Sequence, residues 1–178
     1  MTRRPAEHPD AVDLFLEQWR KELPGVDATP MAVFGRLHRS FMRYQTLINE
    51  VFEQHGINMA AFDVLTALRR SGPPYRRTSG ELAAVSLVSS GGVTLRVDRL
   101  EAAGLVVRER DADDRRVVYA RLTEQGLDLV ERVAQAHFAN EKGMLEGLSE
   151  VEQERLGRLL SKLERSLENA ERTRPTVV

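Results

Sequence analysis

The sequence of 178 residues contains no cysteine, and this absence removes two kinds of chemistry. Without thiols the chain forms no disulfide bond and senses no oxidant through a reactive cysteine. Its histidines lie far apart in the sequence, without the spacing of metal ligands: His8, His38, His55 and His137. We therefore expect no metal site and no resident cofactor.

Long apolar runs are also missing. No stretch approaches the ~20 consecutive apolar residues that span a membrane, and the first ten residues, MTRRPAEHPD, have no apolar core behind their arginines. The missing apolar core after the N-terminal arginines argues against a secretory signal. We find no nucleophile–base pair, phosphate-binding loop or carboxylate cluster of the kind that an enzyme uses. These features predict a cytoplasmic protein that is not an enzyme and forms a single unit over residues 1–178.

The most informative stretch runs from Thr78 to Gly126 and reads TSGELAAVSLVSSGGVTLRVDRLEAAGLVVRERDADDRRVVYARLTEQG. It predicts two short helices, a β-hairpin and the start of a longer helix. In the first helix we expect Ser79 as the N-cap, with Leu82 and Val85 on the inner face. A turn should fall near residues 86–88.

The second helix is expected to begin near Ser89 or Ser90 and to end at Gly104, a left-handed cap. Its inner side carries three apolar residues at helical spacing: Val93, Val97 and Leu100. Its other faces carry small and polar groups suited to the major groove of DNA: Ser90, Thr94, Asp98 and Arg99.

Two β-branched runs, Val106–Arg110 and Arg115–Arg121, flank the acidic turn of residues 111–114 and predict a hairpin. Arg115 and Arg116 stand at its tip, where we expect them to enter or border the minor groove. The candidate DNA-binding residues are therefore Ser89, Ser90, Thr94, Arg99, Arg115 and Arg116.

This layout predicts a mainly α (α+β) fold, a winged helix-turn-helix lobe over residues 57–122 with flanking helices. Amphipathic helices are expected at residues 10–23 and 31–55, after the N-cap Asn58, from Thr123 to about Leu145, and from the Ser149 and Glu152 capping box to about Ala170. The helices over residues 31–55 and 123–170 are predicted to be dimerisation helices of a homodimer. The helix at 10–23 precedes this scaffold.

The net charge is only −1, but it is unevenly distributed. Residues 69–121 hold eleven Lys and Arg against seven Asp and Glu, a net charge of +4, and the remainder carries −5. Positive charge is thus concentrated where such a fold meets phosphate.

Three motifs carry a family resemblance: V-T-x-x-V-D-R-L-E-A-A-G-L-V at 93–106, D-A-D-D-R-R at 111–116 and L-T-E-Q-G at 122–126. With them the sequence resembles the multiple-antibiotic-resistance regulators, the MarR family, over roughly residues 31–168. The resemblance implies a dimeric, ligand-responsive transcription regulator that binds a pseudo-palindromic duplex.

The added N-terminal helix resembles the urate-responsive branch of that family. In that branch four residues hold the ligand: a tryptophan of the extra helix, an aspartate of the helix before the helix-turn-helix, an arginine of the DNA-recognition helix and an arginine of the first strand of the hairpin. The matching residues here are Trp19, Asp63, Arg96 and Arg108. The resemblance implies a repressor that releases its operator when urate or a related purine binds.

The residues themselves are consistent with such a site. Arg96 lies about 70° from the centre of the apolar stripe, so it points inward and needs a partner such as Asp63. Arg108 would complete the pair. Urate, a planar monoanion, would compete with Asp63 for both guanidinium groups and shift the recognition helix.

Other interpretations stay open. Trp19 could simply anchor its helix, and Arg96 with Asp63 could be a fixed ion pair. The ligand could be another small anion, a carboxylate or a phenolic acid, or the fold could be a winged-helix protein–protein module. His137 could lie where the dimer helices cross and make assembly pH-sensitive, although a packed or solvated histidine is the commoner case.

Overall fold

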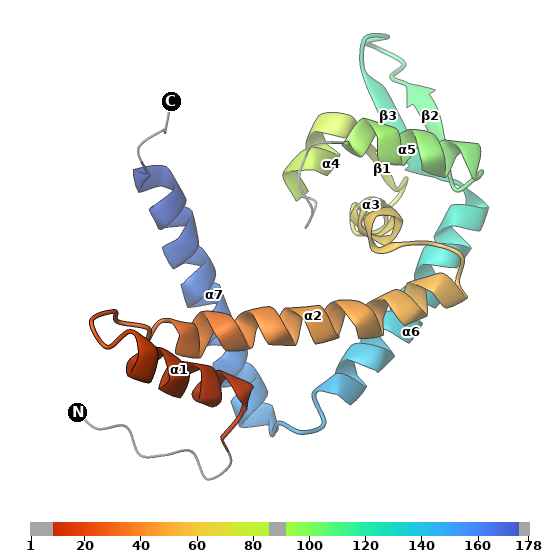
Figure 1. Ribbon diagram of the computed structural model, residues 1–178. Helices are drawn as coiled ribbons and strands as arrows, with labels where there is room; N and C mark the ends of the chain where they lie inside the picture. The colour runs from red at the N-terminus through yellow and green to blue at the C-terminus, as the bar shows by residue number, and fades with distance from the viewer. Residues whose placement is uncertain (1–8, 86–91, 175–178) are drawn as a thin grey trace.

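The computed structural model describes residues 9–85 and 92–174 (Figure 1). The helices are α1 (Ala11–Glu22), α2 (Met31–Gln54), α3 (Met59–Arg69), α4 (Ser79–Val85), α5 (Val93–Ala102), α6 (Glu124–Met144) and α7 (Glu150–Thr173), and the strands are β1 (Arg76–Thr78), β2 (Val106–Arg110) and β3 (Val118–Leu122). This is the mainly helical fold with a small sheet that the sequence predicts.

The strands form one antiparallel sheet in the order β1-β3-β2. Val106 pairs with Leu122 and Arg110 with Val118, so β2 and β3 form the predicted hairpin. The pattern did not predict β1, because three polar residues carry no alternation that could be detected; β1 joins the sheet by pairing with β3.

The second strand of the hairpin begins later than expected. Residues 115–117 continue the turn, in which the Val117 amide donates to the Asp114 carbonyl and the Asp111 carboxylate accepts from the amides of Asp113 and Asp114. The prediction of a strand starting at Arg115 was therefore wrong by three residues. These local hydrogen bonds pair the backbone amides of the turn, which therefore need no hydrogen bonds between strands.

Most helix starts follow the expected caps. Asn58, Thr123 and Ser149 each accept an amide hydrogen bond from the first turn of α3, α6 and α7. The cap of α4 is the exception: Thr78, not Ser79, exchanges hydrogen bonds with Glu81 in a capping box. The start expected for α5 at Ser89 or Ser90 lies outside the described residues, and Gly92, with φ of 100°, precedes the helix that begins at Val93.

The reading lobe, residues 57–122, has a continuous core. Leu82 of α4, Val97 and Leu100 of α5 and Leu122 of β3 are buried together with residues of α2, α3 and α6. Gly104, with φ of 72°, ends α5 as predicted. Val85, expected on the inner face of α4, is instead 39% exposed.

The helical arm, which we define as α1, residues 31–43 of α2 and α7, is built differently. Gly35 of α2 leaves room for Val12 of α1, whose methyl groups would lie 3.2–3.3 Å from an added Cβ. In a single chain, however, α7 has no buried residue. Several apolar residues of the amphipathic helices predicted at residues 10–23 and 31–55 are exposed: Phe15, Trp19, Leu23, Val33, Phe34, Leu37 and Phe41. Helical periodicity predicts which face is apolar but not what covers it.

The lobe and the arm lie at opposite ends of α2 and α6 (Figure 1), and the hairpin of β2 and β3 projects from the lobe on the side away from α2. Within the described part of the chain, no helix combines the length and the apolar character that a membrane span requires.

Candidate nucleic-acid interface and effector cavities

The outer face of α5 is open to solvent. Its inner residues Val93, Val97 and Leu100 are buried, whereas Thr94 and Arg99, both predicted to contact DNA, are exposed. The most outward residue is Leu95, which lies about 170° from the centre of the buried stripe at ~100° per residue and is 53% exposed. The sequence analysis did not place Leu95 among the candidate DNA-binding residues, although the helical arithmetic applied to Arg96 also gives its direction.

The tip of the wing presents two arginines to solvent. Arg116 donates from Nε and Nη2 to the two carboxylate oxygens of Asp114, each at 3.0 Å, and its side chain is 91% exposed. This bidentate pair lowers the pKa of the Asp114 carboxyl and raises that of Arg116. Asp114 therefore fixes the direction of Arg116, while Arg115 beside it is exposed.

Arg108 lies on β2 of the hairpin β2–β3, which we call the wing, and connects it to α5, which we call the recognition helix. Its Nη2 lies 2.5 Å from Oδ1 of Asp98 and its Nη1 lies 3.7 Å from Oε2 of Glu101, both on α5. Its backbone amide also donates to Glu101 at 3.2 Å. In the single chain Arg108 is thus held by two carboxylates of α5 that the sequence analysis did not assign to it. The pairing of Arg96 with Asp63, which Arg108 would complete, stays a prediction.

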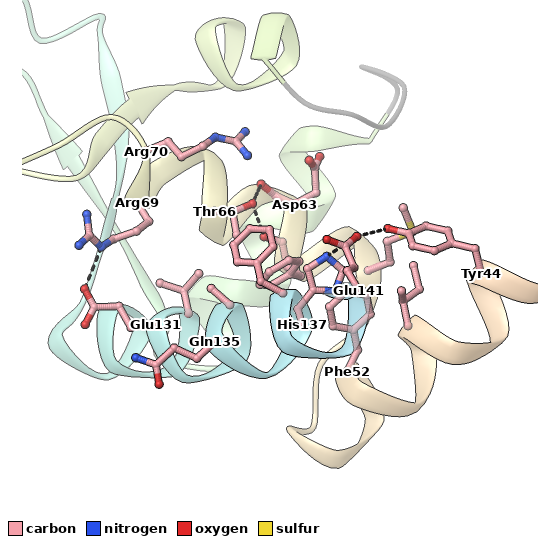
Figure 2. A pocket seen from close by; sticks show the side chains of 16 residues that line it. Tyr44, Phe52, Asp63, Thr66, Arg69, Arg70, Glu131, Gln135, His137 and Glu141 are labelled. Carbon is pink, nitrogen blue, oxygen red and sulfur yellow. Dashed lines mark hydrogen bonds and ion pairs between the residues drawn. The ribbon is translucent and has the colours of Figure 1, made fainter. Parts of the chain in front are cut away.

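A cavity of about 750 Å³ opens between α2, α3 and α6 (Figure 2). Its walls combine aromatic rings with polar groups at the rim: Tyr44, Phe52, Phe62, Phe138, Asp63, Arg69, Arg70 and Gln135. Arg69 reaches Glu131 at 2.8 Å and its guanidinium lies 5.1 Å from the centre of the Tyr75 ring. An aromatic enclosure with guanidinium groups at its edge suits a small planar anion.

His137 lies in the wall of this cavity rather than on an open helix face. Its Nε2 is 3.2 Å from Oε1 of Glu141, which also accepts the Tyr44 hydroxyl at 2.7 Å (Figure 2). Its ring lies 5.3 Å from Phe52 and 5.0 Å from Phe62. Among the residues described here, Nδ1 has no hydrogen-bond partner. The histidine thus joins α6 to α2 within one chain, and its effect on dimer assembly stays a prediction.

Three of the four predicted ligand residues line different cavities in the single chain, and the fourth, Trp19, lies on α1. Asp63 is buried in the wall of the cavity just described, whereas Arg96 borders a second cavity of about 640 Å³ between α5 and the start of α3. Arg108 borders a third, of about 470 Å³, with Thr94 and Arg110. Trp19 is 48% exposed on α1, which packs on α2. Arg96 is half-buried, as its angle on the helix predicts.

Comparison with known proteins agrees with this fold. Residues 55–117 match the MarR family. The transcriptional regulator PecS of Dickeya dadantii is 36% identical over 154 residues, covering 86% of this chain and 93% of PecS. The structure of Bordetella bronchiseptica BpsR, described for its regulation of DNA binding by 6-hydroxynicotinic acid, is similar with a TM-score of 0.66 and 26% identity, over 74% of this chain and 92% of BpsR.

A mutant MarR from E. coli in complex with operator DNA is also similar, with a TM-score of 0.66 and 29% identity over 78% of this chain and 99% of that one. In that protein the same fold is bound to an operator.

Proposed function

Since the chain belongs to the MarR family of DNA-binding transcription regulators and is not an enzyme, we propose that it is a homodimeric repressor that releases a pseudo-palindromic operator on binding urate or a related purine. Two recognition helices, one from each copy, would occupy successive major grooves. The wing arginines, Arg115 and Arg116, would follow the adjoining minor grooves.

The exposed apolar residues of the arm support the dimer. Phe34 and Phe41 of α2 and Leu160 of α7 lie open to solvent in one chain, and apolar surface of this extent marks a protein–protein interface. A second copy would bury it, in the manner of an obligate dimer.

The observation that carries the proposed switch is the double role of Arg108. It borders a cleft beside the recognition helix and at the same time holds the carboxylates of Asp98 and Glu101. An anion that takes over this guanidinium releases both carboxylates, of which Asp98 lies on the exposed side of α5 that would face DNA. Two unneutralised carboxylates near phosphate oppose binding. Asp98, which lies on α5 itself, thus competes with the ligand for Arg108. The sequence analysis had assigned that competition to Asp63.

Trp19, Asp63 and Arg96 complete the proposed urate site in the dimer. Arg96 and Arg108 would hold a planar anion through bidentate hydrogen bonds, with the indole of Trp19 closing over it. Asp63 would compete with the ligand for Arg96, since both are negatively charged and attracted to its guanidinium. The site needs rearrangement or a second copy to bring Trp19 near, because α1 lies along α2 in the arm.

The aromatic cavity favours a second candidate effector, a carboxylate or phenolic acid. Phe62 and Phe138 would enclose an aromatic ring, and Arg69 or Arg70 would bind its negative group. BpsR, with the same fold, responds to an aromatic carboxylate, 6-hydroxynicotinic acid.

Ligand-induced release of a selected operator duplex tests the proposal and separates the two sites. Urate, xanthine, hypoxanthine, citrate and salicylate would be titrated against the protein–DNA complex and, in parallel, in thermal-shift measurements. Arg96→Ala should retain DNA binding and lose most of the urate response. Arg108→Ala, which frees Asp98 and Glu101 as the ligand would, should bind the operator more weakly even without ligand and should lose most of the urate response. Trp19→Phe should weaken ligand binding more than DNA binding.

Arg69→Ala is the matched control. It removes a guanidinium from the aromatic cavity and should leave the urate response intact. If Arg69→Ala abolishes the response and Arg108→Ala does not, the effector lies in the aromatic cavity. DNA binding that does not weaken with salt would instead favour a protein–protein module.

A further inference from the structure

We propose that Leu95 reads the 5-methyl group of a thymine in each half-site of the operator. This inference rests on the proposed binding of α5 in the major groove and names one determinant of its sequence specificity. It derives from the position of a single apolar side chain on an otherwise polar face.

Leu95 is the residue of α5 that points most directly away from the core. Thr94, Asp98 and Arg99 lie at about 90°, 130° and 130° from the centre of the buried stripe, against about 170° for Leu95. A helix that enters the groove with its outer face therefore presents Leu95 at the centre of its contact with the base edges.

The chemistry of a leucine limits what it can recognise there. Its side chain has no hydrogen-bond donor or acceptor, so it gains nothing from phosphate or from the polar base edges. The thymine methyl is the apolar group that the major groove displays. Burying Leu95 against any other edge would desolvate a polar group without a partner.

The neighbours of Leu95 support this assignment. Asp98 is held by Arg108, which reduces its repulsion of phosphate. Arg99 is exposed beside it and carries a guanidinium, a group that can recognise guanine in the major groove. Positive charge thus brings the duplex to a face whose most outward group is apolar.

A solitary exposed leucine needs no explanation on many surfaces. In the described part of the reading lobe, however, the exposed large apolar residues are Val85, Leu95 and Val118, and Leu95 is the most exposed of them at 53%. The remaining exposed apolar residues lie outside the lobe, mostly in the helical arm that we assign to dimerisation. Leu95 is therefore apolar at a position where a dimer would not cover it.

The test uses the full-length protein and a duplex selected from a random pool. Each thymine of the selected half-site is replaced in turn by deoxyuridine, which removes the methyl group and keeps the base pair. We expect one position per half-site at which the replacement weakens wild-type binding about fourfold, and on the order of tenfold with both half-sites changed.

Leu95→Ala should bind the thymine and deoxyuridine duplexes equally well, whereas Leu95→Met, which keeps an apolar side chain, should retain the preference. Leu14→Ala on α1 is the matched control, because Leu14 is 54% exposed but lies in the arm; it should keep the wild-type ratio of affinities.

Equal wild-type affinity for thymine and deoxyuridine at every position would overturn the inference, as would a preference that survives in Leu95→Ala. Failure of the wild-type protein to select any duplex would instead overturn the proposed DNA-binding function. Circular dichroism melting of Leu95→Ala should match that of the wild type, since the side chain removed is exposed.

Discussion

The reading lobe and the helical arm use the same kind of amphipathic helix, but only the lobe covers its apolar faces within one chain. In the lobe, Leu82, Val97 and Leu100 are buried against each other and against α3 and the sheet. In the arm, α7 buries nothing although its leucines form a stripe along one side. The difference supports the proposal that one copy suffices for the lobe fold, whereas a second copy completes the arm. Four changes would test this division, from the largest expected effect to the smallest.

Gly126→Ala should disrupt the lobe. A Cβ at Gly126 would lie 2.0 Å from the carbonyl oxygen of Leu105, where the backbone joins α5 to β2. Backbone cannot move aside as a side chain can, so we expect a loss of about 3 kcal/mol or more in the free energy of unfolding. Urea denaturation at fixed protein concentration measures it.

The control is Gly143→Ala, in the same helix, where an added Cβ meets nothing within 4 Å. It should raise stability slightly, by less than about 1 kcal/mol. Similar destabilisation by both substitutions would contradict the assignment of Gly126 as the close contact.

Leu160→Glu should separate the two copies and leave the lobe folded. The substitution places a charge in the apolar stripe of α7. Operator affinity should fall by about a hundredfold or more, because a monomer has only one reading lobe to bind the two half-sites. Sedimentation and a DNA-binding titration follow the two effects.

Ser161→Glu adds the same charge to the polar side of α7 and should change neither mass nor affinity. A Leu160→Glu protein that remains dimeric would remove this stripe from the interface.

Arg115→Ala combined with Arg116→Ala should weaken operator binding by about tenfold or more, at ~1–3 kcal/mol for each specific contact, and should reduce the slope of affinity against salt. Dimer mass and stability should stay constant, because both side chains are exposed. Unchanged affinity and slope would exclude the wing from DNA binding.

The smallest effect concerns Tyr44, which links α2 to α6 beside the aromatic cavity. Burial, together with its hydrogen bond to Glu141, raises the pKa of Tyr44 from 10.0 to about 12. A pKa raised in the folded state stabilises the protein below pH 10, and this contribution is lost as the pH rises through about 12.

Tyr44→Phe removes this contribution, which we expect to be under about 1 kcal/mol because the side chain is only partly buried. The stability difference between wild type and Tyr44→Phe should shrink between pH 10 and 12. Parallel denaturation curves across that range would contradict the raised pKa.

Sequence patterns predicted the local elements well and the edges of the wing less well. The caps at Asn58, Thr123 and Ser149 and the end of α5 at Gly104 were confirmed, because they depend on side chains and backbone angles within a few residues. Strand β1 was missed, since its three residues form a strand only by pairing with β3.

The candidate sites show the same limit. Exposure of Thr94, Arg99 and the wing arginines could be predicted from helical and hairpin periodicity. The partner of Arg108 could not: Asp98 and Glu101 lie seven to ten residues before it, and the turn at Gly104 brings them to the strand. The assembly of Trp19, Asp63, Arg96 and Arg108 into one site stays a prediction.

The sequence by itself determined the helices, their apolar faces, the hairpin and the family, because each follows from residues close together in the chain or from motifs that it spells out. Only the tertiary structure decided which apolar faces one copy covers, where the cavities lie and which carboxylates hold Arg108. Those features depend on contacts between elements that are distant in sequence, and periodicity within one element carries no information about its neighbour.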